Sequence, residues 1–374
     1  MTAWRHLMTG MESMQPEAYR HGDLVEVRSP AEILATLDDR GACRGLPFMT
    51  SMIQYCGRRF TVEQRADKLC DTIHQSGSRR LPEAVLLAGL RCDGSGYDGC
   101  QADCRPFWKN AWLRRAQAGP APLPATDDRG REALYQRAAG NTRQLADVDG
   151  CKAGNYRCQA TELFRATARV GTKDPRVYLR ELLSGNVTPG RFLRVMPRAF
   201  LDEVRYKLGR LPEATGKPVV RRTAPVPEPK AEAAPEGLGL QAGDWVQVKS
   251  IEEIVATLDD GGKNRGLWFD REMIPYCGKV FRVRQRIQRF IHEATGRMIE
   301  MKRDAVTLEG AVCSGERSLG RWLCPRAILP FWREAWLRRA AAPGAARAPK
   351  ADPAPDAAAS SGNPPDRGVT VPRR

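Results

Sequence analysis

The stretch YCGRRFTV at residues 55–62 decides the fold, because the chain contains it again as YCGKVFRV at residues 276–283. The match extends in both directions at a constant offset of 221 (277 − 56 and 313 − 92) and, after a short insertion, at an offset of 224 (332 − 108). It covers residues 22–115 and 243–339, which we call repeat one and repeat two. Similarity of this length and register indicates one domain that has been duplicated.

Within each repeat, the pattern of apolar residues predicts short strands and one early helix. Residues 22–27 alternate between polar and apolar side chains, as a half-buried strand does, and residues 59–62 and 84–87 are also predicted to be strands. Ser29, Pro30 and Glu32 have the spacing of a helix N-terminus, and this helix is expected to end near Gly41. The predicted class is α+β, with two small β-rich domains that resemble SH3-like barrels of the KOW type, each with a helix insertion and a C-terminal aromatic helix.

The aromatic helix is predicted from Phe107, Trp108 and Trp112, which return at positions 331, 332 and 336. Their i, i+1, i+5 spacing places the first and third side chains on roughly one helical face. Stacking of a base or sugar on these rings is one interpretation. Packing against the sheet is the favoured one, because tryptophan is a large core residue.

Composition changes along the chain predict six segments. The middle of the chain is expected to form helices that begin near Pro175 and Pro189. No apolar run at the start or later is long enough for a signal peptide or a membrane span, so we expect a cytoplasmic protein without a membrane partner. The six predicted segments are an N-terminal extension (1–20), the first β-domain (21–118), a basic helical segment (119–211), a Pro/Ala-rich linker (212–240), the second β-domain (241–341) and a disordered tail (342–374).

Cysteines recur at equivalent positions and predict a metal site in each repeat. Four thiolates, or three with one imidazole, are standard ligand sets for structural zinc. An iron–sulfur cluster in repeat one would use the same thiolates, and repeated core packing is the alternative without metal. The odd total of 11 cysteines argues against a disulfide framework, and Cys151 and Cys158 are interpreted as packing residues or as a spare thiol pair. The candidate ligands are Cys56, Cys70, Cys92, Cys100 and Cys104 in repeat one and Cys277, His292, Cys313 and Cys324 in repeat two.

The chain is basic, with a net charge of +16. Repeat one has 14 Lys and Arg against 12 Asp and Glu, whereas residues 120–212 have 17 against 10. Positive surfaces attract polyanions, and each neutralised phosphate releases a counterion. We therefore predict contact with nucleic acid or an acidic protein through Arg191, Arg194 and Arg198 in the helical segment and Arg282, Arg284 and Arg286, which alternate along a predicted strand.

No arrangement of catalytic residues is apparent, because the chain has only four histidines and no phosphate-binding glycine loop or dinucleotide fingerprint. The leading hypothesis is a non-enzymatic, metal-stabilised binding or scaffolding protein. The alternative is an iron–sulfur or zinc redox protein with its working site in repeat one. The strings GLPFM, YCGRRF, CDT, RCDG, GCQADC and CPRAILPFWREAWLRR resemble an uncharacterised bacterial protein family, and this resemblance implies no activity or site.

Overall fold

A computed structural model describes residues 19–116, 128–171, 174–208 and 237–343. Residues up to Ala340 belong to one compact unit. The predicted N-terminal extension, Pro/Ala-rich linker and tail lie almost wholly outside the described residues. Within the described ranges, no helix is both long enough and apolar enough to cross a membrane.

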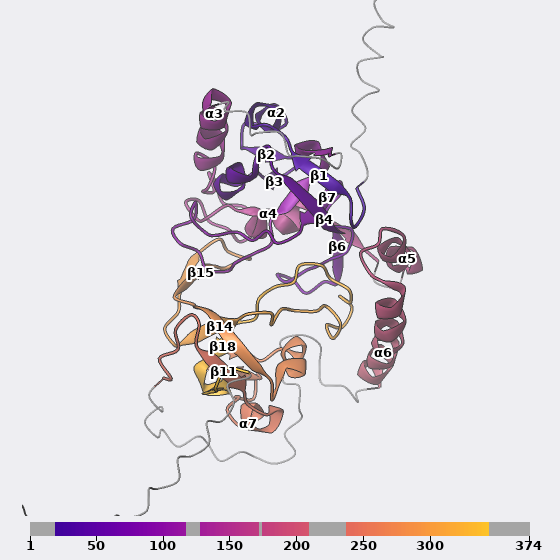
Figure 1. The fold of residues 1–374 in the computed structure, drawn as a ribbon, viewed down its shortest axis with the longest axis vertical. Coiled ribbons are helices and arrows are strands. Elements are labelled where there is room, and N and C mark those ends of the chain that lie inside the picture. Colours follow the sequence, from indigo (N-terminus) through magenta and orange to yellow (C-terminus); the bar gives the residue numbers. More distant parts are fainter. Residues whose placement is uncertain (1–18, 117–127, 172–173, 209–236, 344–374) are drawn as a thin grey trace, which may run out of the picture. The chain divides into compact units, whose positions relative to one another are not determined.

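Repeat one folds around a five-stranded antiparallel sheet with the order β8-β7-β4-β1-β9, of which Figure 1 labels β1, β4 and β7. The first strand, β1, lies between β4 and the last strand, β9. The predicted strands at residues 24–27, 59–62 and 84–87 are confirmed. The strands are β1 (Leu24–Val27), β4 (Arg59–Arg65), β7 (Ala84–Leu87), β8 (Phe107–Lys109) and β9 (Leu113–Arg115).

Repeat two contains a sheet with the same strand order, β18-β17-β14-β11-β19. The pairing register also agrees, since Val25 lies opposite Phe60 and Val246 lies opposite Phe281. Both sheets have a register shift in the second strand, after Val62 in one and after Val283 in the other, and such irregularities bend a strand. The strands are β11 (Trp245–Val248), β14 (Val280–Arg286), β17 (Ala305–Leu308), β18 (Trp332–Arg333) and β19 (Leu337–Arg339).

Short helices begin where the capping signals predict. The Ser29 side chain caps α2 (Pro30–Leu34) and Glu32 bonds back to the Ser29 backbone, while Ser250 and Glu253 do the same for α7 (Ile251–Val255). Both helices end earlier than expected. The remaining small elements of the repeats are β2 (Ala42–Cys43), β3 (Leu46–Pro47), β5 (Leu69–Cys70), β6 (Ser78–Arg80), β12 (Lys263–Asn264), β13 (Leu267–Trp268), β15 (Arg289–Ile291), β16 (Met298–Glu300) and the 3-10 turns at Thr50–Tyr55 and Arg271–Tyr276.

The predicted C-terminal aromatic helix is wrong in both repeats. Residues 107–115 form strand β8, a 3-10 turn over Asn110–Trp112 and strand β9, and repeat two has the same arrangement around Glu334–Trp336. Backbone pairing of β8 with β7 and of β9 with β1 outweighs the helical spacing of the aromatic side chains. The turn between the two strands buries Trp108 and Trp112, the second and sixth residues of this segment, in the core.

The aromatic side chains form the core, as the packing interpretation predicts. Trp108 and Trp112 are fully buried, and so are their counterparts at 332 and 336. Phe48 meets Trp112 edge-on at 5.1 Å between ring centroids, and Phe269 meets Trp336 at 5.5 Å. The Trp112 indole N–H also donates to Thr36 Oγ1 at 3.0 Å. Edge-to-face pairs of this kind stabilise a core beyond the area that they bury.

The segment between the repeats is largely helical and attaches to both of them. It contains α3 (Asp128–Ala139), α4 (Gln159–Ala166), β10 (Ala168–Val170), α5 (Pro175–Leu183) and α6 (Pro189–Lys207). The predicted starts of α5 and α6 are confirmed, with Asp174 and Thr188 as N-caps, and α6 continues through Pro197. Strand β10 pairs with β6 of repeat one, whereas Val195 of α6 packs against Leu319 and Trp322 of repeat two.

Candidate functional site: a cavity lined by cysteines

Each repeat contains a loop that carries cysteines and whose first and last residues are joined by a backbone hydrogen bond. In repeat one the Cys92 N–H donates to the Cys104 carbonyl at 2.8 Å, and in repeat two the Cys313 N–H donates to the Ile328 carbonyl at 2.8 Å. Ile328 is the counterpart of Cys104 at the offset of 224. We call residues 92–104 and 313–328 the cysteine loops.

A glycine near the start of each cysteine loop allows the chain to fold back on itself. Gly94 has a φ of 71°, and a Cβ placed on it would lie 2.0 Å from the Cys100 carbonyl oxygen. Gly315 has a φ of 67°, and a Cβ there would lie 2.7 Å from the Cys324 nitrogen. Only glycine fits a backbone approach this close. Glycine therefore brings the second cysteine of each loop back to the first.

Equivalent strands of the two repeats reach across to the cysteine loop of the other repeat. The Cys70 N–H at the end of β5 donates to Cys324 Sγ at 3.1 Å. The Ile291 N–H at the end of β15, the counterpart of Cys70, donates to Cys100 Sγ at 3.3 Å. Cys100 and Cys324 are themselves counterparts. The two contacts are thus reciprocal, as in an isologous interface between two like subunits.

A second reciprocal pair lies beside the first. The buried Lys68 ammonium donates to the Trp322 carbonyl, and the Arg289 guanidinium donates to the Asp98 carbonyl at 3.4 Å. Arg289 is the counterpart of Lys68, and Trp322 is the counterpart of Asp98. In each repeat, therefore, a cation two residues before the strand end bonds the cysteine loop of the other repeat.

The N-terminus of α4 adds a further thiol. Cys158 is the N-cap residue of α4, and its backbone N–H donates to Thr161 Oγ1 at 2.9 Å. Buried Gln159 fixes this end of the helix, because its side chain donates to the Phe107 carbonyl at 2.9 Å and accepts from the Phe107 N–H at 2.7 Å. Cys158 is thereby held against repeat one.

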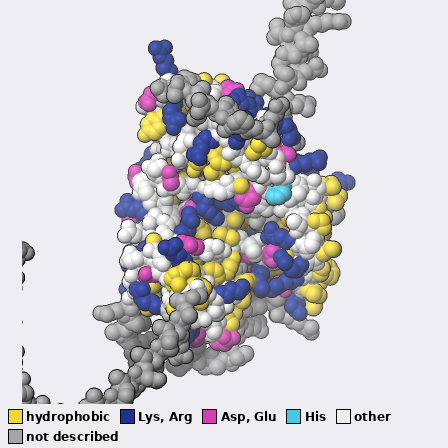
Figure 2. All heavy atoms as spheres, in the orientation of Figure 1, with side chains coloured by type: hydrophobic (Ala, Val, Ile, Leu, Met, Phe, Trp, Pro, Cys, Tyr) yellow, Lys and Arg dark blue, Asp and Glu magenta, His cyan; other side chains and the backbone are white. Residues whose placement is uncertain are grey.

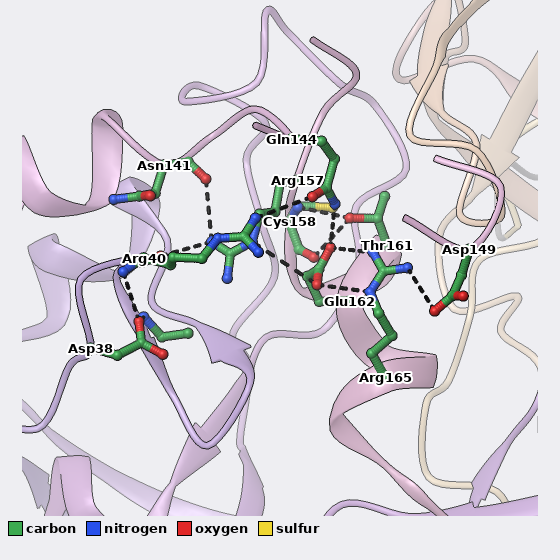
Figure 3. A network of polar contacts seen from close by, with 11 residues as sticks. Asp38, Arg40, Asn141, Gln144, Asp149, Arg157, Cys158, Thr161, Glu162 and Arg165 are labelled. Atoms are coloured by element: carbon green, nitrogen blue, oxygen red, sulfur yellow. Dashed lines mark hydrogen bonds and ion pairs between the residues drawn. The ribbon is translucent and has the colours of Figure 1, made fainter. Parts of the chain in front are cut away.

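A polar network anchors the same helix end (Figure 3). Buried Arg157 donates to the Arg40 carbonyl at 2.8 Å and lies 4.0 Å from the Glu162 carboxylate. Glu162 also accepts hydrogen bonds from Arg165 and Gln144. Figure 3 shows these side chains meeting beside Cys158. The network therefore holds this end of α4, and with it Cys158, in position.

The cysteine loops, β5, β15 and α4 enclose a cavity of about 600 Å³. Its lining mixes thiols with the apolar side chains Phe107, Phe290 and Phe331. Charged side chains of both signs also line it, among them Arg321, Arg326, Glu272 and Glu293. Seven thiols line it, those of Cys70, Cys92, Cys100, Cys104, Cys158, Cys313 and Cys324.

Burial keeps most of these sulfurs protonated. It raises the pKa of Cys92, Cys104 and Cys313, and it raises the pKa of Cys158 to about 12. Cys70 is the exception, because a hydrogen bond from the Cys324 thiol, aided by the nearby guanidinium groups of Arg326 and Arg321, lowers its pKa. Burial and the same hydrogen bond raise the pKa of Cys324.

The candidate ligands do not assemble as one set per repeat. Cys70 of repeat one lies with Cys324 of repeat two, while Cys92 and Cys100 lie near Cys158, which sequence reasoning assigned to packing. Cys56 and Cys277 do not line the cavity, whereas His292 lines it at an exposed position with its ring bonded to Thr295. Among the residues that the structure describes, no three Cys, His, Asp or Glu side chains are placed to hold a metal ion as they stand.

The arginines predicted to bind anions are divided between ion pairs and solvent. Arg284 binds Asp103 at 2.6 Å, and Arg286 bonds Asp304, so these guanidinium groups are occupied within the protein. The Arg282 side chain donates to the Gly243 carbonyl at 3.2 Å. Their common strand β14 is bent by the register shift beside Arg284, which breaks the regular alternation that places them on one face.

Three arginines of α6 remain near the surface. Arg191 binds Glu316 of repeat two at 2.9 Å, and Arg194 approaches the same carboxylate at 3.5 Å with a largely exposed side chain. Arg198 is exposed one turn later.

No protein-family model, curated protein or solved structure matches the chain.

Proposed function

We propose that this protein is a non-enzymatic binding or scaffolding protein that binds an acidic, amphipathic helix of a partner protein through α5 and α6. The observation that carries this proposal is a second apolar stripe on α6. Val195 and Ala199 face the protein interior, whereas Leu193 and Phe200 are 71% and 68% exposed. Exposed apolar patches of this kind mark interaction sites.

Basic and apolar side chains alternate on this surface. We define the α5–α6 face by its exposed apolar residues Leu179, Leu183, Leu193, Phe200, Leu201 and Val204 and its basic residues Arg194, Arg198, Arg205 and Lys207. Figure 2 shows yellow and dark blue side chains mixed along the edge that α5 and α6 occupy in Figure 1.

Leucine and phenylalanine side chains favour a protein partner over nucleic acid, since phosphate contact needs basic and polar groups rather than aliphatic ones. Helix-in-groove recognition places apolar anchors at i, i+3, i+4 and i+7, and charges at the rim select the partner. Leu193, Phe200, Leu201 and Val204 fall at i, i+7, i+8 and i+11 on α6, which places them on one face of the helix. An acidic helix would meet the surrounding arginines.

The test measures binding of a fluorescein-labelled amphipathic peptide with Glu on its polar face to the full-length protein by anisotropy. We expect Phe200→Asp and Arg198→Glu each to weaken binding at least tenfold. Tyr135→Asp changes an exposed aromatic residue of α3 and should leave the affinity unchanged. Equal affinity in all variants, or tighter binding of a single-stranded oligonucleotide than of the peptide, would overturn the proposal.

A metal centre in the cavity is the second candidate, and the gathering of seven thiols around one space supports it. We propose zinc, or alternatively an iron–sulfur cluster, bound by Cys92, Cys100, Cys104 and Cys158. These sulfurs would have to approach one another from their described positions. A bound zinc ion would stabilise the joint between α4 and repeat one.

Metal content and the visible spectrum of anaerobically purified protein test this centre. Zinc that is retained in Cys56→Ser but lost in Cys158→Ser would support it, and visible charge-transfer absorption with the same dependence would favour the cluster. Absence of metal from the wild-type protein would leave the thiols as core residues.

We also propose that the repeats arose by duplication of an SH3-like domain, which the shared strand order and the shared register shift support.

A further inference from the structure

We infer that Cys70 and Cys324 form a reversible disulfide that joins repeat one to repeat two beside the cavity. Their positions carry the inference. The Cys70 nitrogen lies 3.1 Å from Cys324 Sγ, so the backbone of one cysteine touches the thiol of the other. A disulfide requires Cα atoms about 4.4–6.8 Å apart, and contact between the backbone of one cysteine and the sulfur of the other is compatible with this range.

The equivalent contact in the other repeat lacks the second cysteine. At the reciprocal contact, the Ile291 N–H donates to Cys100 Sγ in the same way, but residue 291 has no thiol. The fold therefore makes this backbone contact with or without a second cysteine. A cysteine at position 70 adds a sulfur beside Cys324 that the backbone contact does not need.

The surroundings of Cys70 and Cys324 differ from those of a cysteine that serves as an apolar core residue. Buried Arg321 donates to the Asp71 carbonyl at 3.0 Å, and Arg326 lies close enough to both sulfurs to act on their ionisation. Both cysteines are buried, with 8% and 7% of their surface exposed, and both line the cavity, through which a small reagent would reach them. Three cations, those of Lys68, Arg321 and Arg326, act on these sulfurs against one carboxylate, that of Glu293, which is bound to Arg326. Reactive cysteines occur in electropositive surroundings, whereas structural ones are surrounded by apolar groups.

The oxidant that we propose is a low-molecular-weight disulfide of the glutathione class. The Cys70 thiolate attacks one sulfur of this disulfide, breaks its S–S bond and expels one small thiolate, which leaves a mixed disulfide on Cys70. Cys324 then loses its proton and attacks the Cys70 sulfur, forming the Cys70–Cys324 bond and expelling the second small thiolate. Two protein thiols are oxidised, one small disulfide is reduced to two thiols, and the protein protons pass to the leaving groups.

The experiment equilibrates metal-free, full-length protein in buffers of graded reduced and oxidised glutathione, alkylates the free thiols and identifies cross-linked peptides by mass spectrometry. We expect a peptide pair containing Cys70 and Cys324 that dithiothreitol removes. Cys70→Ser and Cys324→Ser should each abolish it, whereas Cys277→Ser, which alters a thiol outside the cavity, should not. Oxidation should also raise the midpoint of urea denaturation in the wild-type protein but not in Cys70→Ser.

A designed variant keeps the test informative if the serine variants do not fold. Ile291→Cys places a thiol at the reciprocal contact, so this variant should form an additional cross-link between position 291 and Cys100. If Ile291→Cys gives the additional cross-link while Cys70 and Cys324 stay reduced, the inference is wrong. It is equally wrong if neither pair cross-links, or if Cys70 pairs with Cys313.

Discussion

Thr72 donates a hydrogen bond to Glu293, and these two residues occupy the same position in the two repeats. In an isologous contact, a residue that touches its own counterpart lies at the axis that relates the two halves. The reciprocal contacts of the cysteine loops lie around this point. Glu293 also holds the buried guanidinium of Arg326 in an ion pair.

Removing the charge of Glu293 should therefore destabilise the contact between the repeats. Glu293→Gln leaves the Arg326 guanidinium buried without a carboxylate, which typically costs about 3 kcal/mol of unfolding free energy. The measurement is urea denaturation. Glu300→Gln is the matched control, because its ion pair with Arg289 is exposed and should contribute less than about 1 kcal/mol. Similar losses in both variants would contradict the importance of the central ion pair.

The glycine at the start of the first cysteine loop allows a second matched comparison. Gly94 and Gly99 have φ values of 71° and 73°, so alanine introduces similar backbone strain at either position. A Cβ at Gly94 would also meet the Cys100 carbonyl at 2.0 Å, whereas a Cβ at Gly99 has no atom within 4 Å. Gly99→Ala should cost about 1 kcal/mol of unfolding free energy, and Gly94→Ala distinctly more. The denaturation midpoints would show this, and equal midpoints would mean that the loop relaxes freely.

The two core tryptophans of repeat one differ in one hydrogen bond. The Trp112 indole N–H bonds Thr36, whereas the buried Trp108 indole N–H has no hydrogen-bond partner among the described residues. Phenylalanine removes a similar volume at either position. Trp112→Phe should therefore lower the unfolding free energy by about 1 kcal/mol more than Trp108→Phe, the usual worth of such a bond. Calorimetry of the two variants measures the difference. The reverse order would contradict a stabilising hydrogen bond between Trp112 and Thr36.

The buried carboxyl of Glu181 on α5 should make stability depend on pH. Burial raises the pKa of Glu181 from its ordinary value of 4.5 to about 7. Between these values the folded protein holds a proton that the unfolded chain has released, so the unfolding free energy falls as the pH rises through this window.

Glu181→Gln removes this titration and keeps an amide that can hydrogen-bond Asn186. The variant should be more stable than the wild type at pH 7.5 by up to about 3 kcal/mol, and the difference should shrink towards pH 4.5. Urea denaturation across this pH range tests it, with Glu132→Gln on the exposed side of α3 as the control. A constant difference at all pH values would exclude the titration of Glu181 as the cause.

The sequence by itself determined the features that depend on neighbouring residues. The strands at 24–27 and 59–62, the caps at Ser29 and Thr188, and the buried tryptophans follow from alternation, capping and size. These signals act within a few residues and are repeated in two segments, so they could be recognised without coordinates.

Only the tertiary structure decided which residues meet across the chain. Cys70 meets Cys324, although 254 residues separate them, and Cys158 joins the cysteines of repeat one through the anchoring of α4. Residues 107–115 form strands because β1 and β7 supply backbone partners that a local pattern cannot reveal. Local sequence specifies backbone preferences, but the free energy that selects these contacts comes from partners brought together only when both repeats pack.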